Sequence, residues 1–172
     1  PFSQSIAWST DGLVGAKRFL ERVWRLKEKA QNTVHKDQTK HKTQNTNLDS
    51  LLHQAIKKVG EDIEHFRFNT AVSSLMILLN ALEKEESIST ETFKTFIKLL
   101  SPFAPHLAEE LWMRLGYKKS VHTELWPFYD PIVAESMPVT IIVQVNGKRR
   151  GSFIADRGSA KEQLQETALA LP

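Results

Sequence analysis

Apolar residues recur at helical spacing in the first half of the chain, with one polar interruption. Between Thr10 and Lys27 they return every three to four positions, which predicts a helix that starts at Thr10-Asp11. Residues 30–47 contain almost no apolar side chain and are expected to form a linker or a mobile loop. The next amphipathic stretch predicts a helix from Leu48 to His65, with a buried stripe that runs on to Phe66 and with Lys57, Lys58, Glu61 and Asp62 facing outward.

Three further helices are predicted between residues 69 and 116. Asn69 is a suitable N-cap for a helix that extends to about Glu85, and this helix is apolar on most sides, which predicts a central position. Ser89-Thr90 caps the following helix. Pro105 suits the first position of the last of the three, and Gly116 suits its left-handed end.

The pattern then changes from helical to extended. Residues 117–138 predict an ordered connector whose aromatic side chains either pack along the bundle or stack on nucleic-acid bases. Alternation from Val139 predicts a strand, Asn146-Gly147 predicts a type I′ hairpin turn, and residues 149–155 form the returning strand. Ser159 and Glu162 form a capping box that opens a final helix.

These elements predict a mainly α fold: an antiparallel helical bundle followed by a small, truncated α+β piece. We expect the bundle and its connector to occupy residues 1–137 and the α+β piece to occupy residues 138–172. Two strands and one helix make a poor independent core, so we expect a further strand beyond Pro172.

The composition restricts the cellular location and the kinds of site that this protein can have. The chain has 172 residues, of which 41% are hydrophobic, and no cysteine, which excludes disulfides and thiolate metal sites and fits a cytoplasmic protein. No apolar run is long enough to cross a membrane, and the start lacks the layout of a signal peptide. The chain does not begin with Met, so we expect it to be part of a longer protein.

The sequence contains no catalytic constellation. No glycine-rich phosphate loop and no H-E-x-x-H motif occurs, the acidic pairs are adjacent and would point in different directions on a helix, and the six histidines are scattered. We therefore predict no catalytic residue, no metal ligand and no cofactor in this chain. A stand-alone hydrolase or metalloenzyme is disfavoured, and a binding role is favoured.

Positive charge is concentrated although the net charge is only +3. Lys17, Arg18, Arg22 and Arg25 lie on the first predicted helix, and Lys148-Arg149-Arg150 follow the hairpin turn. A cluster of this kind is either a solvated surface or the footprint of a nucleic-acid partner.

Several stretches together resemble one family. Trp8-Ser9-Thr10-Asp11-Gly12, with the helix after it, is similar to the entry into the anticodon-binding bundle of bacterial-type leucyl-tRNA synthetases. Further resemblance is carried by Arg67-Phe68-Asn69-Thr70-Ala71, by Ser101-Pro102-Phe103-Ala104-Pro105-His106 and by Val143-Gln144-Val145-Asn146-Gly147-Lys148. The proline-rich segment is shared with related class I synthetases, whereas the other two runs point to the leucyl enzymes.

The resemblance implies a C-terminal portion of a class I aminoacyl-tRNA synthetase. Such an enzyme attaches leucine to its tRNA with ATP and magnesium in a catalytic domain, which this chain would lack together with the editing domain. The implied partners are leucine tRNA and the catalytic domain of the same polypeptide, with no membrane and no DNA.

The expected tRNA-binding residues are cationic. They are Lys17, Arg18, Arg22, Arg25, Arg67, Lys148, Arg149 and Arg150. Binding through phosphates predicts an association that weakens steeply with salt. The competing hypothesis, a bundle that docks other protein domains, predicts a large exposed apolar patch and an association that salt hardly affects.

Overall fold

The computed structural model describes residues 10–31, 46–135, 139–155 and 159–170. The bundle consists of α1 (Thr10–Gln31), α2 (Thr46–Glu64), α3 (Phe68–Leu82), α4 (Thr90–Leu100) and α5 (Pro105–Arg114). The elements after it are η1 (Val121–Thr123), α6 (Pro131–Glu135), β1 (Val139–Val145), β2 (Lys148–Ala155) and α7 (Lys161–Leu169). The mainly α class with a small α+β piece is therefore confirmed.

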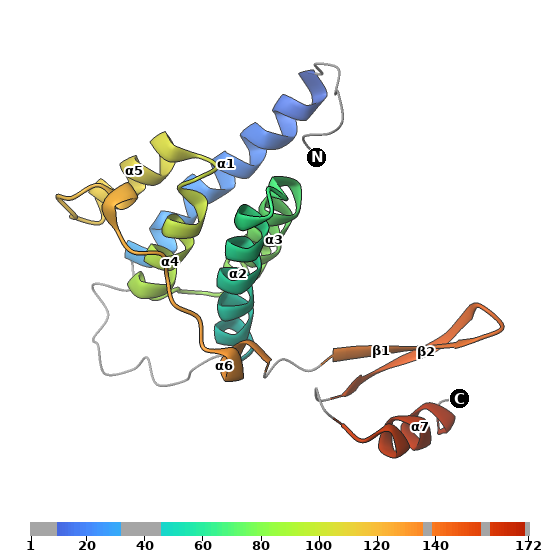
Figure 1. Cartoon of the computed structure of the whole chain (residues 1–172). Coiled ribbons are helices and arrows are strands. Elements are labelled where there is room, and N and C mark those ends of the chain that lie inside the picture. Colours follow the sequence, from blue (N-terminus) through green and yellow to red (C-terminus); the bar gives the residue numbers. More distant parts are fainter. Residues whose placement is uncertain (1–9, 32–45, 136–138, 156–158, 171–172) are drawn as a thin grey trace.

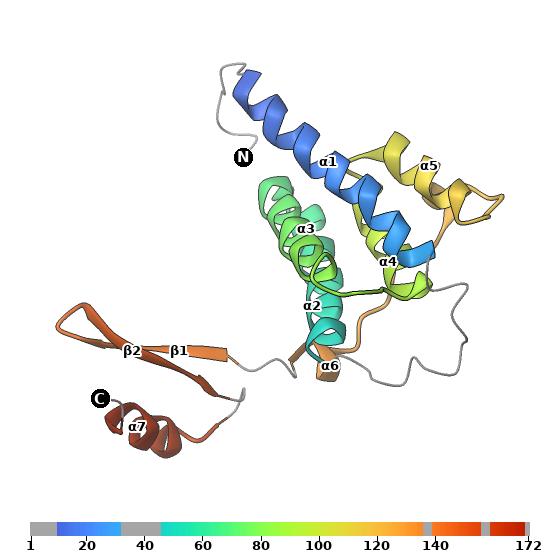
Figure 2. The same ribbon diagram turned by 180° about the vertical axis from the view of Figure 1, so that it is seen from behind.

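The helices α2 and α3 form an antiparallel pair, and α1 runs past them toward α4 and α5 (Figure 1). Large side chains from α3, α4 and α5, such as Leu79, Phe93, Phe96 and Trp112, are fully buried between the helices. In both views the hairpin and α7 lie apart from the bundle, beyond α6 (Figure 2). Within the described residues, none of the helices combines the length and the apolar character that crossing a membrane requires.

Local sequence signals place the ends of α4 and α5 as predicted. The Ser89 hydroxyl accepts a hydrogen bond from the Thr92 amide at 3.0 Å, which satisfies a free amide of the first turn of α4. Pro105 begins α5, where a missing amide proton costs nothing. Gly116 follows this helix with φ +93°, a conformation that glycine adopts without strain.

The predicted start of α3 is wrong. The helix begins at Phe68 and its N-cap position is Arg67, which provides no side-chain cap, so Asn69 lies inside the helix. The helix has neighbours on several faces as predicted, since it packs against α1, α2 and α4. Part of its surface is nevertheless open, because Met76 is 37% exposed and Ile77 is 56% exposed.

The end of α2 also differs from its prediction. Phe66 is 66% exposed instead of continuing the buried stripe, and Asp62 is fully buried instead of facing water. Phe66 has φ +55°, so the chain turns away from the helix axis at this residue.

The connector contains short helices that its sequence did not predict. The helix α6 is fixed to α2, since Gln54 donates to the Ala134 carbonyl at 2.7 Å and the Asp130 amide donates to His53 Nδ1 at 2.8 Å. Some aromatic side chains pack as expected, for example Tyr117, which stacks on Trp112 at 4.4 Å between ring centroids. Phe128, in contrast, is 83% exposed.

The hairpin is confirmed, with positive φ angles at both Asn146 and Gly147 as a type I′ turn requires. The antiparallel register pairs Val143 with Gly151 and Gln144 with Arg149, which leaves Arg150 as the extra residue of a β-bulge. The capping-box prediction is wrong, because α7 begins at Lys161 and its N-cap position is Ala160, which provides no side-chain hydrogen bond.

Candidate nucleic-acid interface

The basic residues of α1 share one helical face. Arg18, Arg22, Arg25 and Lys29 are spaced by four, three and four positions, so they follow one another along the same side of the helix. This side lies next to the C-terminal end of α3, where Glu83 follows the last helical residue. Arg22 and Lys29 have partners at this end of α3, whereas Arg18 and Arg25 form no ion pair within the described residues.

Arg22 is held by the protein itself. Its Nε donates to Glu83 Oε1 at 3.0 Å, and a terminal nitrogen lies 2.5 Å from both Glu83 Oε2 and Asn80 Oδ1. The hydrogen bond with Glu83 raises the pKa of Arg22 and lowers the pKa of Glu83, in each case against the opposing effect of burial. Arg22 is therefore not the uncommitted surface cation that its sequence position predicted.

Lys29, absent from the predicted site, also has a structural role. Its amino group donates to the main-chain carbonyl of Glu83 and, at 2.7 Å, to that of Glu85. A cation at the carbonyl end of a helix is favoured by the helix dipole.

The other predicted residues of α1 are more accessible. Arg18 and Arg25 are exposed, and neither forms an ion pair within the part of the chain that the structure describes. Lys17 lies 3.6 Å from Glu21, and both side chains are largely exposed, which makes this a weak pair. The row on α1 therefore offers Arg18 and Arg25 to a partner, with Lys17 as a loosely paired neighbour.

Arg67 lies at the corner between α2 and α3. Its Nε donates to Asp62 Oδ1 at 2.8 Å, and Lys58 Nζ donates to the same oxygen at 2.6 Å. The side chains of Arg67 and Lys58 remain 49% and 47% exposed. Sequence analysis missed Lys58 and Asp62 as a pair, although their spacing of four residues on one helix is the signal that would have indicated it.

The hairpin turn carries the most open charge. Lys148, Arg149 and Arg150 are all exposed, and none has an ion pair among the residues that the structure describes. Arg149 donates to the Ser152 hydroxyl at 3.0 Å. The bulge at Arg150 interrupts the strict alternation of side chains between the two faces of the hairpin.

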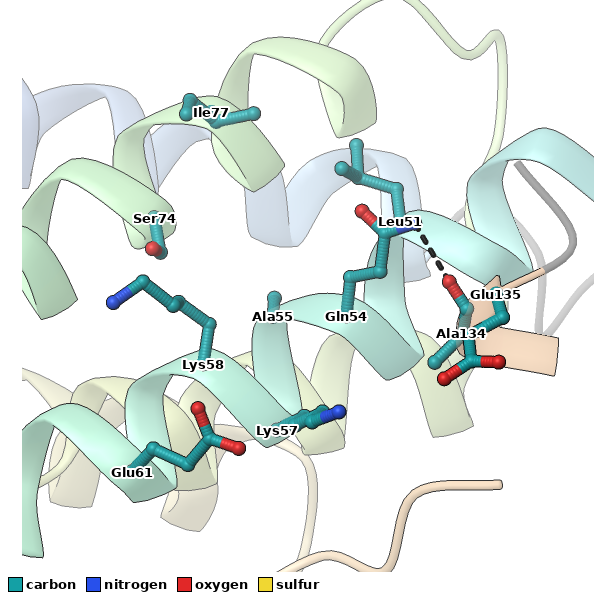
Figure 3. A pocket seen from close by; sticks show the side chains of 10 residues that line it. All are labelled: Leu51, Gln54, Ala55, Lys57, Lys58, Glu61, Ser74, Ile77, Ala134 and Glu135. Carbon is teal, nitrogen blue, oxygen red and sulfur yellow. Dashed lines mark hydrogen bonds between the residues drawn. The ribbon is translucent and has the colours of Figure 1, made fainter. Parts of the chain in front are cut away.

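Two hollows lie on the surface of the bundle. One, of about 340 Å³, lies between α2, α3 and α6 and is lined by Leu51, Ala55, Ile77 and the stems of Lys57 and Lys58 (Figure 3). In Figure 3 these two lysines leave α2 toward opposite sides of the pocket.

The second hollow is an apolar groove of about 660 Å³ between the N-terminal half of α1, α3 and the corner before α5. Gly12 and Gly15 help to open it, since nothing lies within 4 Å of where their Cβ atoms would be. The described residues contain no group of three or more acidic or histidine side chains placed to share a metal ion.

Comparison with known proteins decides the family. A family model described as the anticodon-binding domain of tRNA ligase matches residues 45–165. The chain belongs to this family. The matched range runs from the start of α2 into α7, so it includes the corner at Arg67 and the hairpin turn.

This anticodon-binding-domain chain is also similar to named enzymes. It is 46% identical over 168 residues, or 98% of its length, to leucine–tRNA ligases of Chlorobaculum tepidum and Chlorobaculum parvum, and it spans 21% of each. It also superposes, with a TM-score of 0.73 and 29% sequence identity, on a chain from the crystal structure of the ternary LeuRS–tRNA–LeuAMS complex of Agrobacterium radiobacter. The superposition covers 97% of this chain and 23% of that chain.

Proposed function

We propose that this chain is the tRNA-binding part of a leucine–tRNA ligase, which docks and positions leucine tRNA for the rest of the enzyme. The family model and the 46% identity to two leucine–tRNA ligases support this assignment. A similar chain of known structure occurs in a complex that contains tRNA. The complete enzyme would attach leucine to its tRNA with ATP.

The observation that carries the proposal is the unneutralised charge at the hairpin turn. Lysine and arginine side chains bind a phosphate backbone by displacing the counterions condensed on it, and a side chain neutralised by a carboxylate of its own contributes less to this binding. Lys148, Arg149 and Arg150 have no such carboxylate within the described structure. Arg18 and Arg25 are the corresponding candidates on the bundle, whereas Lys17 and Arg22 are expected to contribute less because each is paired with a carboxylate of its own. Arg67 is also a candidate although it is paired, because it shares the single carboxylate of Asp62 with Lys58.

The proposal assigns separate roles to the two parts of this chain and places the chemistry elsewhere in the complete enzyme. Residues 1–137 would grip the tRNA with the helical bundle, and residues 138–172 would add a second contact through the hairpin. ATP and magnesium would bind in parts of the enzyme that this chain does not span, since its sequence contains no phosphate-binding loop. On its own the chain would be inactive and cofactor-free, and the complete enzyme would work in the cytoplasm.

Salt dependence of binding tests the proposal. The affinity of the 172-residue chain for a leucine tRNA transcript would be measured by fluorescence anisotropy between about 50 and 200 mM salt, where several phosphate contacts reduce affinity steeply. A helical protein of equal net charge with no relation to tRNA is the control. Equal affinities and equal salt slopes for the two proteins would refute a tRNA-binding role.

A specific observation also supports a second function, the docking of another part of the same polypeptide. Leu13 is 49% exposed, Val14 is 48% exposed and Leu20 is 36% exposed along the N-terminal half of α1. Leu20 lines both the apolar groove and an adjoining hollow that contains Leu13 and Val14. The curated relatives are about five times as long as this chain, so the same polypeptide supplies an obvious occupant for an uncovered apolar surface.

The docking function predicts that a substitution on this apolar surface affects the complete ligase but not the 172-residue chain alone. Leu13→Ser with Val14→Ser should leave the melting temperature of the 172-residue chain nearly unchanged, because both side chains are already about half exposed. In the complete ligase the same change should lower both the melting temperature and the aminoacylation rate. An unchanged complete enzyme would exclude docking at this surface.

A further inference from the structure

The corner between α2 and α3 contains a buried carboxylate that holds two cations. Asp62 Oδ1 accepts from Lys58 Nζ and from Arg67 Nε, so the two cationic nitrogens are neighbours on a single oxygen. Asp62 has no exposed side-chain surface, whereas about half of each cationic side chain faces solvent. Asp62 Oδ2 is buried and has no hydrogen-bond partner among the described residues. The protein thus encloses the negative charge and leaves the positive charges accessible.

The turn that follows α2 places Arg67 over Asp62. The Arg67 amide donates to the Asp62 carbonyl at 2.7 Å and the Phe66 amide donates to the Ile63 carbonyl at 3.1 Å, with Phe66 in the left-handed region at φ +55°. This is the hydrogen-bond pattern of a Schellman motif, in which the second residue past the helix packs against the residue five positions earlier. Here an ion pair takes the place of the usual apolar contact, and Phe66 takes the place of the usual glycine.

The charges in this corner favour the ionised state. Burial alone would raise the pKa of Asp62, but the hydrogen bonds from Lys58 and Arg67, together with the charge of Lys58, lower it. The carboxylate is therefore ionised at neutral pH, and the corner has one more positive charge than negative charge. The N-terminus of α3 adds partial positive charge, because no side chain caps it at Arg67.

We propose that Asp62 is a positioning residue that holds the side chains of Lys58 and Arg67 as a paired binding site for one phosphate of the tRNA backbone. Among the described residues the guanidinium bonds to Asp62 Oδ1 through Nε alone, so the terminal nitrogens of Arg67 are available there to donate to phosphate oxygens. Lys58, held on the same oxygen, supplies a second donor beside it. The inference rests on the proposed tRNA-binding function and assigns a residue pair to it.

Removing the charge of Asp62 distinguishes a positioning role from general electrostatic attraction, because the two predict opposite changes in affinity for tRNA. Asp62→Asn takes one negative charge away, and general attraction to a polyanion would then strengthen binding. If Asp62 positions the two cations, the same change releases both side chains and weakens binding. If the ion pair is purely structural, Asp62→Asn would change the stability of the protein but would still strengthen binding to tRNA, as general electrostatics predicts.

The experiment compares Asp62→Asn with Glu110→Gln in the 172-residue chain. Glu110 pairs with Arg114 at 2.6 Å on the exposed surface of α5, so its removal makes the same change in net charge without touching the corner. We expect Asp62→Asn to reduce affinity for leucine tRNA by about fivefold to tenfold, with a smaller salt slope, and Glu110→Gln to bind equally well or better. Binding by Asp62→Asn that equals or exceeds that of Glu110→Gln overturns the proposal.

A second variant avoids dependence on the folding of Asp62→Asn. Arg67→Lys keeps the charge and changes a half-exposed side chain, but lysine lacks the Nε that holds the fork on Asp62. With folding checked by circular dichroism, Arg67→Lys should lose affinity to the same degree, and wild-type affinity overturns the proposal. If charge reversal at Lys148, Arg149 and Arg150 reduces binding while Asp62→Asn and Arg67→Lys do not, only this inference fails. If the unaltered chain shows no salt-dependent binding, the proposed function fails with it.

Discussion

The two basic clusters of this molecule look alike in sequence and differ in structure. On α1, Arg22 and Lys29 are occupied by the carboxylate and the main-chain carbonyls at the end of α3. At the hairpin turn, Lys148, Arg149 and Arg150 extend from a two-stranded ribbon and have no ion pair within the described residues. Two members of the α1 cluster fasten this helix to the end of α3, whereas all three residues of the hairpin cluster present their charge to solvent.

The difference shows that clustering alone does not identify a binding surface. The α1 cluster has a carboxylate beside it, Glu83, and the hairpin cluster has none among the described residues. Glu83 lies 61 residues after Arg22 in the chain, so the clustering of charge along the sequence could not reveal this pair. The corner at Arg67 is intermediate, because Asp62 pairs with its cations and leaves about half of each side chain open. Variants at these positions test the distinction directly.

The largest effect is expected from charge reversal at the hairpin turn. Replacing Lys148, Arg149 and Arg150 by Glu should reduce affinity for leucine tRNA by about 100-fold and lower the salt slope by about one unit per lost phosphate contact. The melting temperature should hardly change, because all three side chains are exposed. The matched control reverses Lys84, Lys118 and Lys119, which are also exposed, and a loss of the same size there would show that only net charge matters.

The next largest effect concerns stability. Arg22→Glu places a carboxylate against Glu83 and Asn80, so it should lower the free energy of unfolding by about 1–2 kcal/mol. Arg18→Glu on the same helical face has no such partner to lose and should change it far less. Urea denaturation of both variants measures the difference, and equal losses would contradict the structural assignment of Arg22.

Acid should weaken the α1 cluster and leave the hairpin cluster unaffected. The hydrogen bond from Arg22 lowers the pKa of Glu83 in the folded protein, against the effect of burial, and the charges of Arg22, Arg25 and Lys29 add to this lowering. The stabilisation is therefore complete above the pKa of the unfolded chain, about 4.3, and is lost as pH falls through the lower folded value.

Melting temperatures between pH 7 and pH 3 provide the measurement for this pH prediction. Below about pH 5, Glu83→Gln should show a shallower decline than the unaltered protein, because its side chain no longer titrates. An identical decline for Glu83→Gln and the unaltered protein would argue against the pair with Arg22.

The smallest effect is expected at Phe66. Glycine adopts the left-handed conformation at φ +55° without strain, so Phe66→Gly removes a cost of about 1 kcal/mol. The same change removes the edge-to-face contact with Phe68, whose ring centroid lies 6.0 Å away, which offsets part of the gain. We expect a free energy of unfolding within about 1 kcal/mol of the original value. A destabilisation well beyond that would show that the ring contributes more than the strain.

Much of the fold could be predicted because it depends on short-range chemistry. Pro105, Gly116 and Ser89 act through their own backbone or a neighbouring amide, and Asn146-Gly147 forms the expected turn by accepting two positive φ angles. Where two local signals compete, prediction failed. Asn69 and Ser159 are good caps by composition, yet the helices begin at Phe68 and Lys161, and the positions before them are Arg67 and Ala160.

The amino-acid sequence by itself determined which segments of the bundle and of the hairpin are helical or extended, because hydrophobic spacing and turn residues act over a few positions. It also placed the cations of α1 and the hairpin on their elements. It did not determine the short helices η1 and α6 of the connector. Only the tertiary structure decided which of those cations are available. Asp62 became buried by the packing of α2 against α3, and Glu83 reached Arg22 across the bundle. Ion pairing depends on distance in space, and helices far apart in the chain set that distance when they pack.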